Sequence, residues 1–243
     1  MSTQTETLRT ALKLDNFDPE VAGKESLSYA RRAPWDRNRF AEEQIRWLVR
    51  QVFFSREVDA ARQVVFSAVE HTDIAALCLQ VGQILSDQVS GSICVVEADV
   101  HARESASVLL NNGRPRGAGQ KTFPPLRDSS RKISDQLWLV PLKVFLGDQQ
   151  NDLSSPRLRE RLAELRLEFD YTVVQAPPAG LYSEAALLGQ LSDGMILVLQ
   201  ANSTRRAAAK KVKQMLQATN VRLLGAVLSD RTFPIPQKLY QKL

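Results

Sequence analysis

Short apolar runs alternate with helical patterns along most of this chain, and this alternation constrains the fold more than any other feature. The apolar runs lie at 63–68, 92–98, 137–144, 171–176, 194–200 and 222–228, and the helical patterns at 72–88, 155–168, 182–191 and 204–219. Continuous apolar runs of this length are typical of strands that are covered on both faces. We therefore predict an α/β fold: a mostly parallel, doubly wound sheet with helices on both faces.

The rest of the chain divides into an arm, a lead-in helix and an insertion. Residues 1–36 mix charge, Pro and Gly without periodicity, which predicts a flexible N-terminal arm ahead of a single domain at 37–243. Apolar residues at helical spacing predict an amphipathic lead-in helix at 39–54. The polar stretch 101–135 is too long for an ordinary connection, so we predict a loose insertion with room for one short helix.

Composition limits the possible partners and compartment. The formal net charge of +5 permits contact with anionic lipid, nucleic acid or acidic protein without choosing among them. Cys78 and Cys94 lie inside apolar runs and are predicted to be buried thiols, and no metal site is expected. No apolar stretch approaches the roughly 20 residues that cross a bilayer, so we expect a cytoplasmic protein whose membrane contact is peripheral or through a partner.

The turn after the first predicted strand, residues 67–73, is where a sheet of this kind usually cradles a phosphate. A P-loop needs glycines, whose backbone N–H groups close on the phosphate, and a lysine that offsets its charge. No glycine occurs between Gly23 and Gly82, and no lysine between Lys24 and Lys121. Misplacing the strand by a few residues therefore cannot restore the motif.

Acidic side chains stand in this turn instead. Its residues include Glu70, His71, Thr72 and Asp73. Two carboxylates beside a polyphosphate would each cost on the order of 1 kcal/mol or more, so no bound nucleotide is expected. The stretch GAGQKT at 117–122 resembles a P-loop, but no strand precedes it and the following Phe-Pro-Pro blocks a helix, so we interpret it as a basic loop.

Four segments are similar to motifs of one known family. RQVVFSA at 62–68 is similar to its strand before the P-loop, VVEADV at 95–100 to its Walker A′ motif, FDYTVVQAPP at 169–178 to its Walker B motif, and LGAVLSDRTFPIPQKLY at 224–240 to its C-terminal segment. On these segments the chain resembles the ATPase domain of bacterial polysaccharide-type tyrosine autokinases, relatives of MinD and ParA. The resemblance implies a P-loop fold and ATP-dependent protein tyrosine kinase activity in capsule or exopolysaccharide biosynthesis.

The departures from that family's pattern concern its chemistry. Glu97 stands where the Walker A′ aspartate is usual, and Asp99 remains two residues later. Gln175 replaces the Walker B aspartate that organises magnesium, and a neutral amide cannot supply that charge. Together with the missing glycines and lysine, the Walker motifs are degenerate in three separate parts of phosphoryl transfer.

The resemblance extends weakly to an oligomerisation motif, E-x-x-R-x-x-R. Residues 43–46 read Glu-Gln-Ile-Arg, whereas Val49 holds the position of the second arginine and Arg50 follows it. In the family this motif implies assembly into homo-oligomers.

Three hypotheses for the function follow. The first is a non-catalytic pseudokinase without a cofactor, which regulates or scaffolds exopolysaccharide or capsule assembly by docking on a polysaccharide co-polymerase or on an active kinase paralogue. The second is a divergent tyrosine kinase that binds ATP and Mg²⁺ through Glu97, Asp99 and Arg103.

The third hypothesis is a MinD/ParA-like protein that binds a membrane or DNA through a basic surface. The cations of one predicted helix suggest it: Arg205, Arg206, Lys210, Lys211 and Lys213. We favour a solvated helix face here, and do not expect nucleic-acid binding, because alanines between the cations supply helix propensity rather than groups that read bases.

Overall fold

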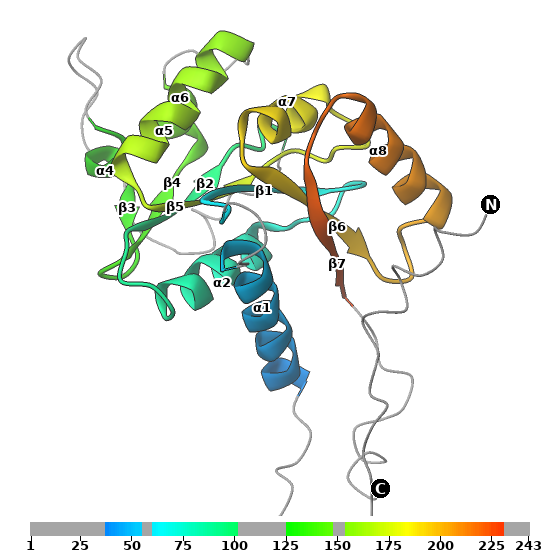
Figure 1. The fold of residues 1–243 in the computed structure, drawn as a ribbon, viewed down its shortest axis with the longest axis horizontal. Helices are drawn as coiled ribbons and strands as arrows, with labels where there is room; N and C mark the ends of the chain where they lie inside the picture. Colours follow the sequence, from blue (N-terminus) through cyan, green and yellow to red (C-terminus); the bar gives the residue numbers. More distant parts are fainter. Residues whose placement is uncertain (1–36, 55–59, 102–124, 148–153, 231–243) are drawn as a thin grey trace, which may run out of the picture. The chain divides into compact units, whose positions relative to one another are not determined.

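A computed structural model describes residues 37–54, 60–101, 125–147 and 154–230 of the chain. They lie in one compact unit, Asp36–Leu243, and the predicted arm at 1–36 falls outside them. In chain order the elements are α1 (Arg37–Phe53), β1 (Gln63–Ala68), α2 (Ala75–Ser86), β2 (Ile93–Glu97), α4 (Leu126–Ser129), β3 (Arg131–Lys132), β4 (Leu137–Val140), α5 (Leu142–Leu146), α6 (Ser155–Glu168), β5 (Tyr171–Gln175), α7 (Ser183–Leu191), β6 (Gly194–Gln200), α8 (Arg206–Ala218) and β7 (Leu223–Ser229) (Figure 1). The lead-in helix expected at 39–54 thus corresponds to α1.

The strands form one sheet in the order β3-β4-β2-β5-β1-β6-β7. Every neighbouring pair is parallel except the short antiparallel pair of β3 and β4. Strand β1 lies between β5 and β6 and is buried at every position, as expected for a strand with helices on both faces. The predicted fold class is confirmed.

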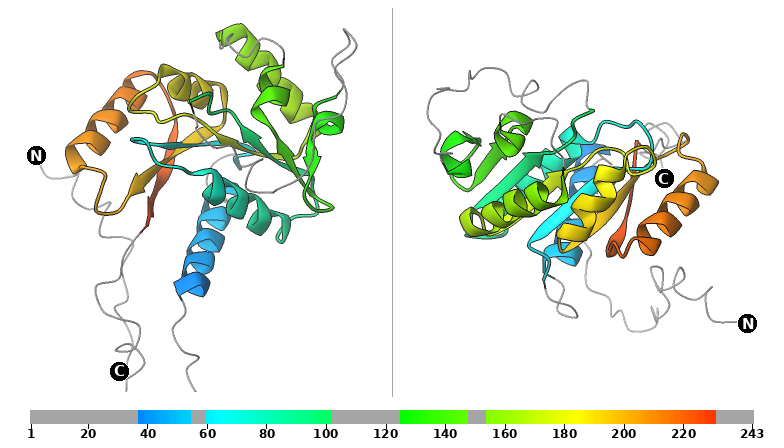
Figure 2. Two further views of the ribbon diagram at one scale, coloured as in Figure 1. Left: turned by 180° about the vertical axis from the view of Figure 1, so that it is seen from behind. Right: turned by 90° about the horizontal axis from the view of Figure 1, so that it is seen from above.

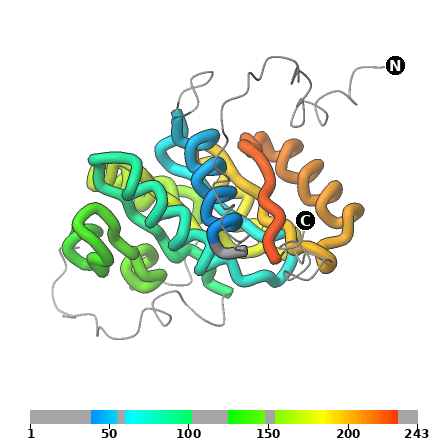
Figure 3. Tube along the Cα trace, turned by 90° about the horizontal axis from the view of Figure 1, so that it is seen from below, coloured from blue at the N-terminus to red at the C-terminus, as the bar shows by residue number. Residues whose placement is uncertain are grey.

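Helices cover the two faces of this sheet separately. Side chains of α5, α6, α7 and α8, such as Leu162, Leu188 and Leu216, form the hydrophobic core of one face, and Figure 2 shows α6, α7 and α8 arranged across it. Helices α1 and α2 lie side by side on the opposite face (Figure 3). There Phe53 and Leu85 belong to a second core cluster. Because helices cover both faces of the sheet, a functional site has room only at the ends of the strands.

Two segments differ from the sequence-based expectation. The strand expected at 137–144 ends at Val140, and helix α5 follows Pro141; the prediction was wrong for the last residues because a proline nitrogen cannot donate to the strand ladder. Within 101–135, the described end holds α4 and β3. The Leu126 and Arg127 amides donate to the Glu168 carboxylate at 2.9 and 2.6 Å, which fixes the first turn of α4. The P-loop-like stretch GAGQKT at 117–122 and Arg103 lie outside the described residues.

The two thiols are buried and free, as predicted. Burial raises the pKa of the Cys78 thiol well above its usual range and that of Cys94 to about 12. Both side chains therefore stay protonated and act as apolar packing groups at neutral pH.

Asp193 ties the start of β1 to helix α6. Its Oδ2 accepts hydrogen bonds from the Arg62 and Gln63 amides, both at 2.8 Å, and its Oδ1 pairs with Arg166 Nη2 at 2.6 Å. Burial alone would raise the pKa of Asp193, but the hydrogen bonds from Arg166, Gln63 and Arg62 outweigh burial and hold the pKa below its usual range. The carboxylate thus stabilises the fold in its charged form.

We expect Asp193→Asn to lower the free energy of unfolding by about 1–3 kcal/mol at pH 7, because charge-assisted hydrogen bonds to the carboxylate weaken. Since the folded-state pKa is depressed, this stabilisation is complete above the unfolded pKa of about 3.9 and is lost as the pH falls through the folded value. Urea titrations from pH 7 to pH 3 should show the wild-type advantage shrinking only below about pH 4. A difference that stays constant down to pH 3 would contradict this origin.

Candidate functional site

The carboxyl ends of β1, β2, β5 and β6 lie at one edge of the sheet, since these strands are parallel neighbours. Ligands of open α/β sheets bind outside this edge. The loops that emerge there are 69–74, 98–101, 176–182 and 201–205. The residues that the sequence analysis named at the phosphate and Walker positions, 70–73, Glu97, Asp99 and Gln175, are at these strand ends or in these loops.

The loop after β1 is bound through its backbone to neighbouring segments. The Val69 amide donates to the Val198 carbonyl at 3.2 Å, and the Val69 carbonyl accepts from the Gly180 amide at 3.1 Å. The Ala179 amide donates to the Ala68 carbonyl at 2.8 Å. The first backbone groups of this loop are therefore already paired with β6 and with the loop after β5.

The rest of this loop, residues 70–74, places a carboxylate at the start of α2. The helix expected from residue 72 begins at Ala75, and the Ala75 amide donates to Asp73 Oδ1 at 2.8 Å. A helix N-terminus attracts anions because its first amides are unpaired. Asp73 occupies one of those amides, while Thr72 Oγ1 lies 3.5 Å from Gln200 Oε1 and Glu70 is half-buried.

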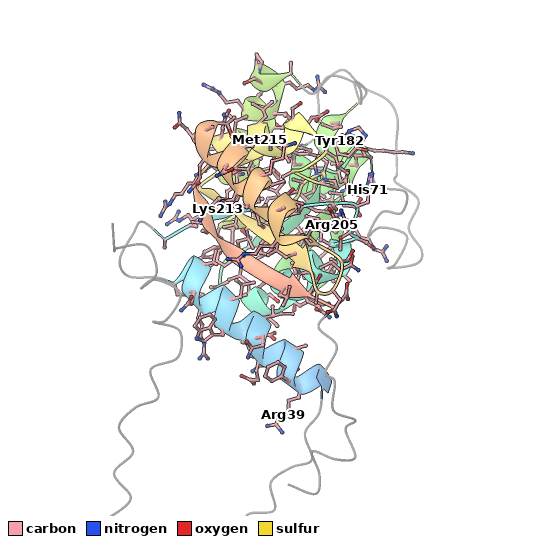
Figure 4. All side chains as sticks on the ribbon, turned by 90° about the vertical axis from the view of Figure 1, so that its right-hand side faces the viewer. Arg39, His71, Tyr182, Arg205, Lys213 and Met215 are labelled. Atoms are coloured by element: carbon pink, nitrogen blue, oxygen red, sulfur yellow. The ribbon has the colours of Figure 1, made fainter. Side chains whose placement is uncertain are left out.

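Both histidines of the chain contact one tyrosine at this edge. The His101 ring stacks on Tyr182 with centroids 3.6 Å apart and an 8° angle between planes, and the His71 ring meets Tyr182 edge-on at 6.1 Å. Figure 4 labels His71 and Tyr182 at this end of the sheet. His101 Nε2 also lies 3.8 Å from Glu184 Oε1. The stack links the loops after β1, β2 and β5, and no sequence motif had indicated Tyr182 or His101.

Glu97 and Gln175 lie side by side at the ends of β2 and β5. They are paired residues in the register of β2 and β5, and each is only 4% exposed. Gln175 Oε1 has no hydrogen-bond partner among the described residues. Asp99 lies two residues beyond Glu97, where its Oδ1 accepts from the His101 amide at 2.9 Å. The paired positions at the ends of β2 and β5 therefore hold one carboxylate, of Glu97, and one amide, of Gln175, in place of two carboxylates.

The remaining candidates lie elsewhere or carry no site. On α1, Arg46 pairs with Glu42 of the same helix, and Val49 is fully buried in the core. Nowhere in the described ranges do three or more His, Cys, Asp or Glu side chains gather in a way that would hold a metal ion. Among the helices that the structure describes, none is long and apolar enough to cross a membrane.

Curated tyrosine-protein kinases share part of this sequence. CpsD of Streptococcus agalactiae serotype III is 36% identical over 94 residues, which make up 39% of this chain and 40% of that protein. YwqD of Bacillus subtilis is 30% identical over 79 residues, 32% of this chain and 33% of that protein. Over these stretches the chain is similar to bacterial tyrosine-protein kinases. The matched stretches span two fifths or less of the length of these relatives, and no family model matches the chain.

Solved structures place this chain in a known fold. The kinase domain of Escherichia coli tyrosine kinase ETK superposes with a TM-score of 0.64 at 15% identity, covering 81% of this chain and 79% of that chain. The MinC:MinD cell division complex of Aquifex aeolicus gives a TM-score of 0.53 at 15% identity, with 69% and 67% covered. At such identities the likeness establishes the fold alone, which is the MinD-like P-loop NTPase fold.

Proposed function

We propose that this chain is a non-catalytic, kinase-like protein that regulates or scaffolds bacterial exopolysaccharide or capsule assembly. The observation that carries this proposal is the Asp73 carboxylate, which accepts the Ala75 amide at the start of α2. A P-loop directs such amides at a phosphate, whereas a fixed carboxylate there repels one. The loop also lacks the glycines and the lysine that would compensate.

The metal side of the site supports the same proposal. Mg²⁺ is held in phosphoryl-transfer sites by carboxylates together with phosphate oxygens. Gln175 offers a neutral amide at the end of β5, beside Glu97 on β2. The residues present therefore do not fit Mg-ATP, and no catalytic step is assigned to them.

The proposed role is binding to a protein partner. The described elements form one seven-stranded sheet with a hydrophobic core on each face, so the chain retains a folded surface on which a partner could bind. The relatives are named tyrosine-protein kinases. We therefore propose an active kinase paralogue or a polysaccharide co-polymerase as the partner, with a cytoplasmic protein held at the membrane through it.

A divergent, ATP-binding tyrosine kinase is the second candidate. Glu97 and Asp99 keep acidic groups at and after the end of β2, and Gln175 Oε1, without a hydrogen-bond partner among the described residues, is a buried oxygen that a cation could use. Arg103, the cation that this candidate needs, lies outside the described residues.

The two candidates differ in their response to Mg-ATP. A ligand at 100 times its Kd stabilises the folded state by about 2.7 kcal/mol, which a thermal-shift assay detects easily. We expect no change in Tm at millimolar Mg-ATP and no heat in isothermal titration, with an active kinase domain as the assay control. ATP hydrolysis by the purified protein that Glu97→Ala abolishes would overturn the non-catalytic proposal.

A further inference from the structure

The positive charge of the chain is concentrated in one segment. Between Asp193 and Asp230 there is no acidic residue, and residues 194–229 contain six cations: Arg205, Arg206, Lys210, Lys211, Lys213 and Arg222. This segment therefore contributes +6 to the formal net charge of +5, so the rest of the chain sums to 5 − 6 = −1. A surface that used charge only for solubility would intersperse both signs.

The fold places these cations on one exposed surface, the α8 face. Strands β6 and β7 carry none of them; Arg206 and the three lysines are on α8, and Arg205 and Arg222 flank it. All six side chains are exposed, and none forms an ion pair with a described carboxylate. Figure 4 labels Arg205 and Lys213 along this helix. The partial positive charge at the start of α8 adds to the same field.

The α8 face is the side of the helix that points away from the hydrophobic core. Val212 and Leu216 are buried against the sheet, so the helix packs along its length, and it lies beside α7 (Figure 2). Ala207 and Gln214 are exposed between the cations, and Met215 is 39% exposed. No aromatic side chain occurs on α8 that could stack on nucleic-acid bases.

We propose that the α8 face, which the sequence alone led us to interpret as a solvated helix face, docks on the anionic lipid headgroups of a membrane surface. Clusters of 4–8 Lys and Arg residues bind acidic phospholipids by charge complementarity. Six exposed cations without an ion pair to a described carboxylate meet that description, and α8 offers no aromatic group that would favour single-stranded nucleic acid over a bilayer. The exposed Met215 adds an apolar group that can enter the headgroup boundary.

The test measures binding of the full chain to vesicles that contain about 30% phosphatidylserine in phosphatidylcholine, at low salt. The α8 variant carries Lys210→Gln, Lys211→Gln and Lys213→Gln. The matched control carries Arg39→Gln, Lys143→Gln and Arg159→Gln, three exposed cations away from α8. Each variant lowers the formal net charge from +5 to 5 − 3 = +2, so global charge is held equal.

We expect the α8 variant to bind at least tenfold more weakly, because each cation at an anionic surface contributes roughly a fivefold factor. The control should stay within about twofold of wild type, pure phosphatidylcholine should not bind, and salt should weaken binding steeply. Replacing the same three lysines with arginine should retain binding, which separates charge from folding. The proposal would be overturned if both glutamine variants lost the same vesicle affinity, or if the chain bound neutral vesicles. It would also be overturned if the chain bound duplex DNA more tightly than vesicles and the α8 variant weakened DNA binding as strongly.

Discussion

Replacing Gly180 by alanine is expected to lower the free energy of unfolding by about 2–3 kcal/mol, because the new methyl group meets a backbone atom. A Cβ at this position would lie 2.3 Å from the Val69 carbonyl oxygen and 3.1 Å from Val212 Cγ2. The carbonyl cannot turn away without losing its hydrogen bond from the Gly180 amide. The loop after β5 and the loop after β1 would have to separate.

Gly225→Ala is the matched control for this substitution. Nothing lies within 4 Å of a Cβ built on Gly225, in edge strand β7. Alanine there should be neutral or stabilise by up to about 1 kcal/mol through the unfolded chain. Urea unfolding at pH 7 compares the two variants, and equal stabilities would show that the contact between the two loops does not constrain the site.

Restoring a carboxylate at the Walker B position, by Gln175→Asp, is expected to destabilise the protein without conferring ATP binding. Glu97 is the neighbour of Gln175 across the strand pair, and both side chains are 4% exposed. Two buried carboxylates on paired residues of neighbouring strands repel each other. We therefore expect the free energy of unfolding to fall by roughly 2–4 kcal/mol at pH 7. The loss should shrink on acidification, because protonating one carboxyl of the variant removes the repulsion.

A double-mutant cycle with Glu97→Gln isolates this repulsion. The double variant carries one amide and one carboxylate, exchanged between the strands, and should recover most of the stability, with a coupling energy above about 1 kcal/mol. Additive losses would mean that the two side chains do not interact.

The same variants probe the proposed loss of activity. If the loop at 69–74 is what excludes nucleotide, Gln175→Asp remains without a thermal shift in Mg-ATP, because Asp73 still occupies the Ala75 amide. If Gln175→Asp instead gained affinity for Mg-ATP, Gln175 alone would be what prevents nucleotide binding, and the divergent kinase would be favoured.

Much of the fold could be predicted from local patterns. The bounds predicted for β1, α6 and β6, at 63–68, 155–168 and 194–200, agree with the structure. Apolar runs and helical spacing are properties of neighbouring residues, so they appear in the sequence directly. The shorter β4 had a local signal in Pro141, which the apolar run obscured.

The candidate site was only partly predictable. The missing glycines and lysine of the first loop, and the amide at Gln175, are visible in the sequence itself, although their functional meaning stays a prediction. The helix start at Ala75 was placed three residues too early, because an amide held by the Asp73 side chain cannot be distinguished from a helical one in a sequence pattern.

By itself, the sequence determined the α/β fold class, most strand positions and the lack of glycine and lysine in the turn after β1, because each depends on residues close together in the chain. Only the tertiary structure decided that Gly180 closes on Val69, that Tyr182 joins His71 to His101, and that the cations of α8 share one exposed face without ion pairs to the carboxylates that the structure describes. These contacts join segments far apart in the sequence, and they form only when the packing of the sheet and helices sets the distances between them.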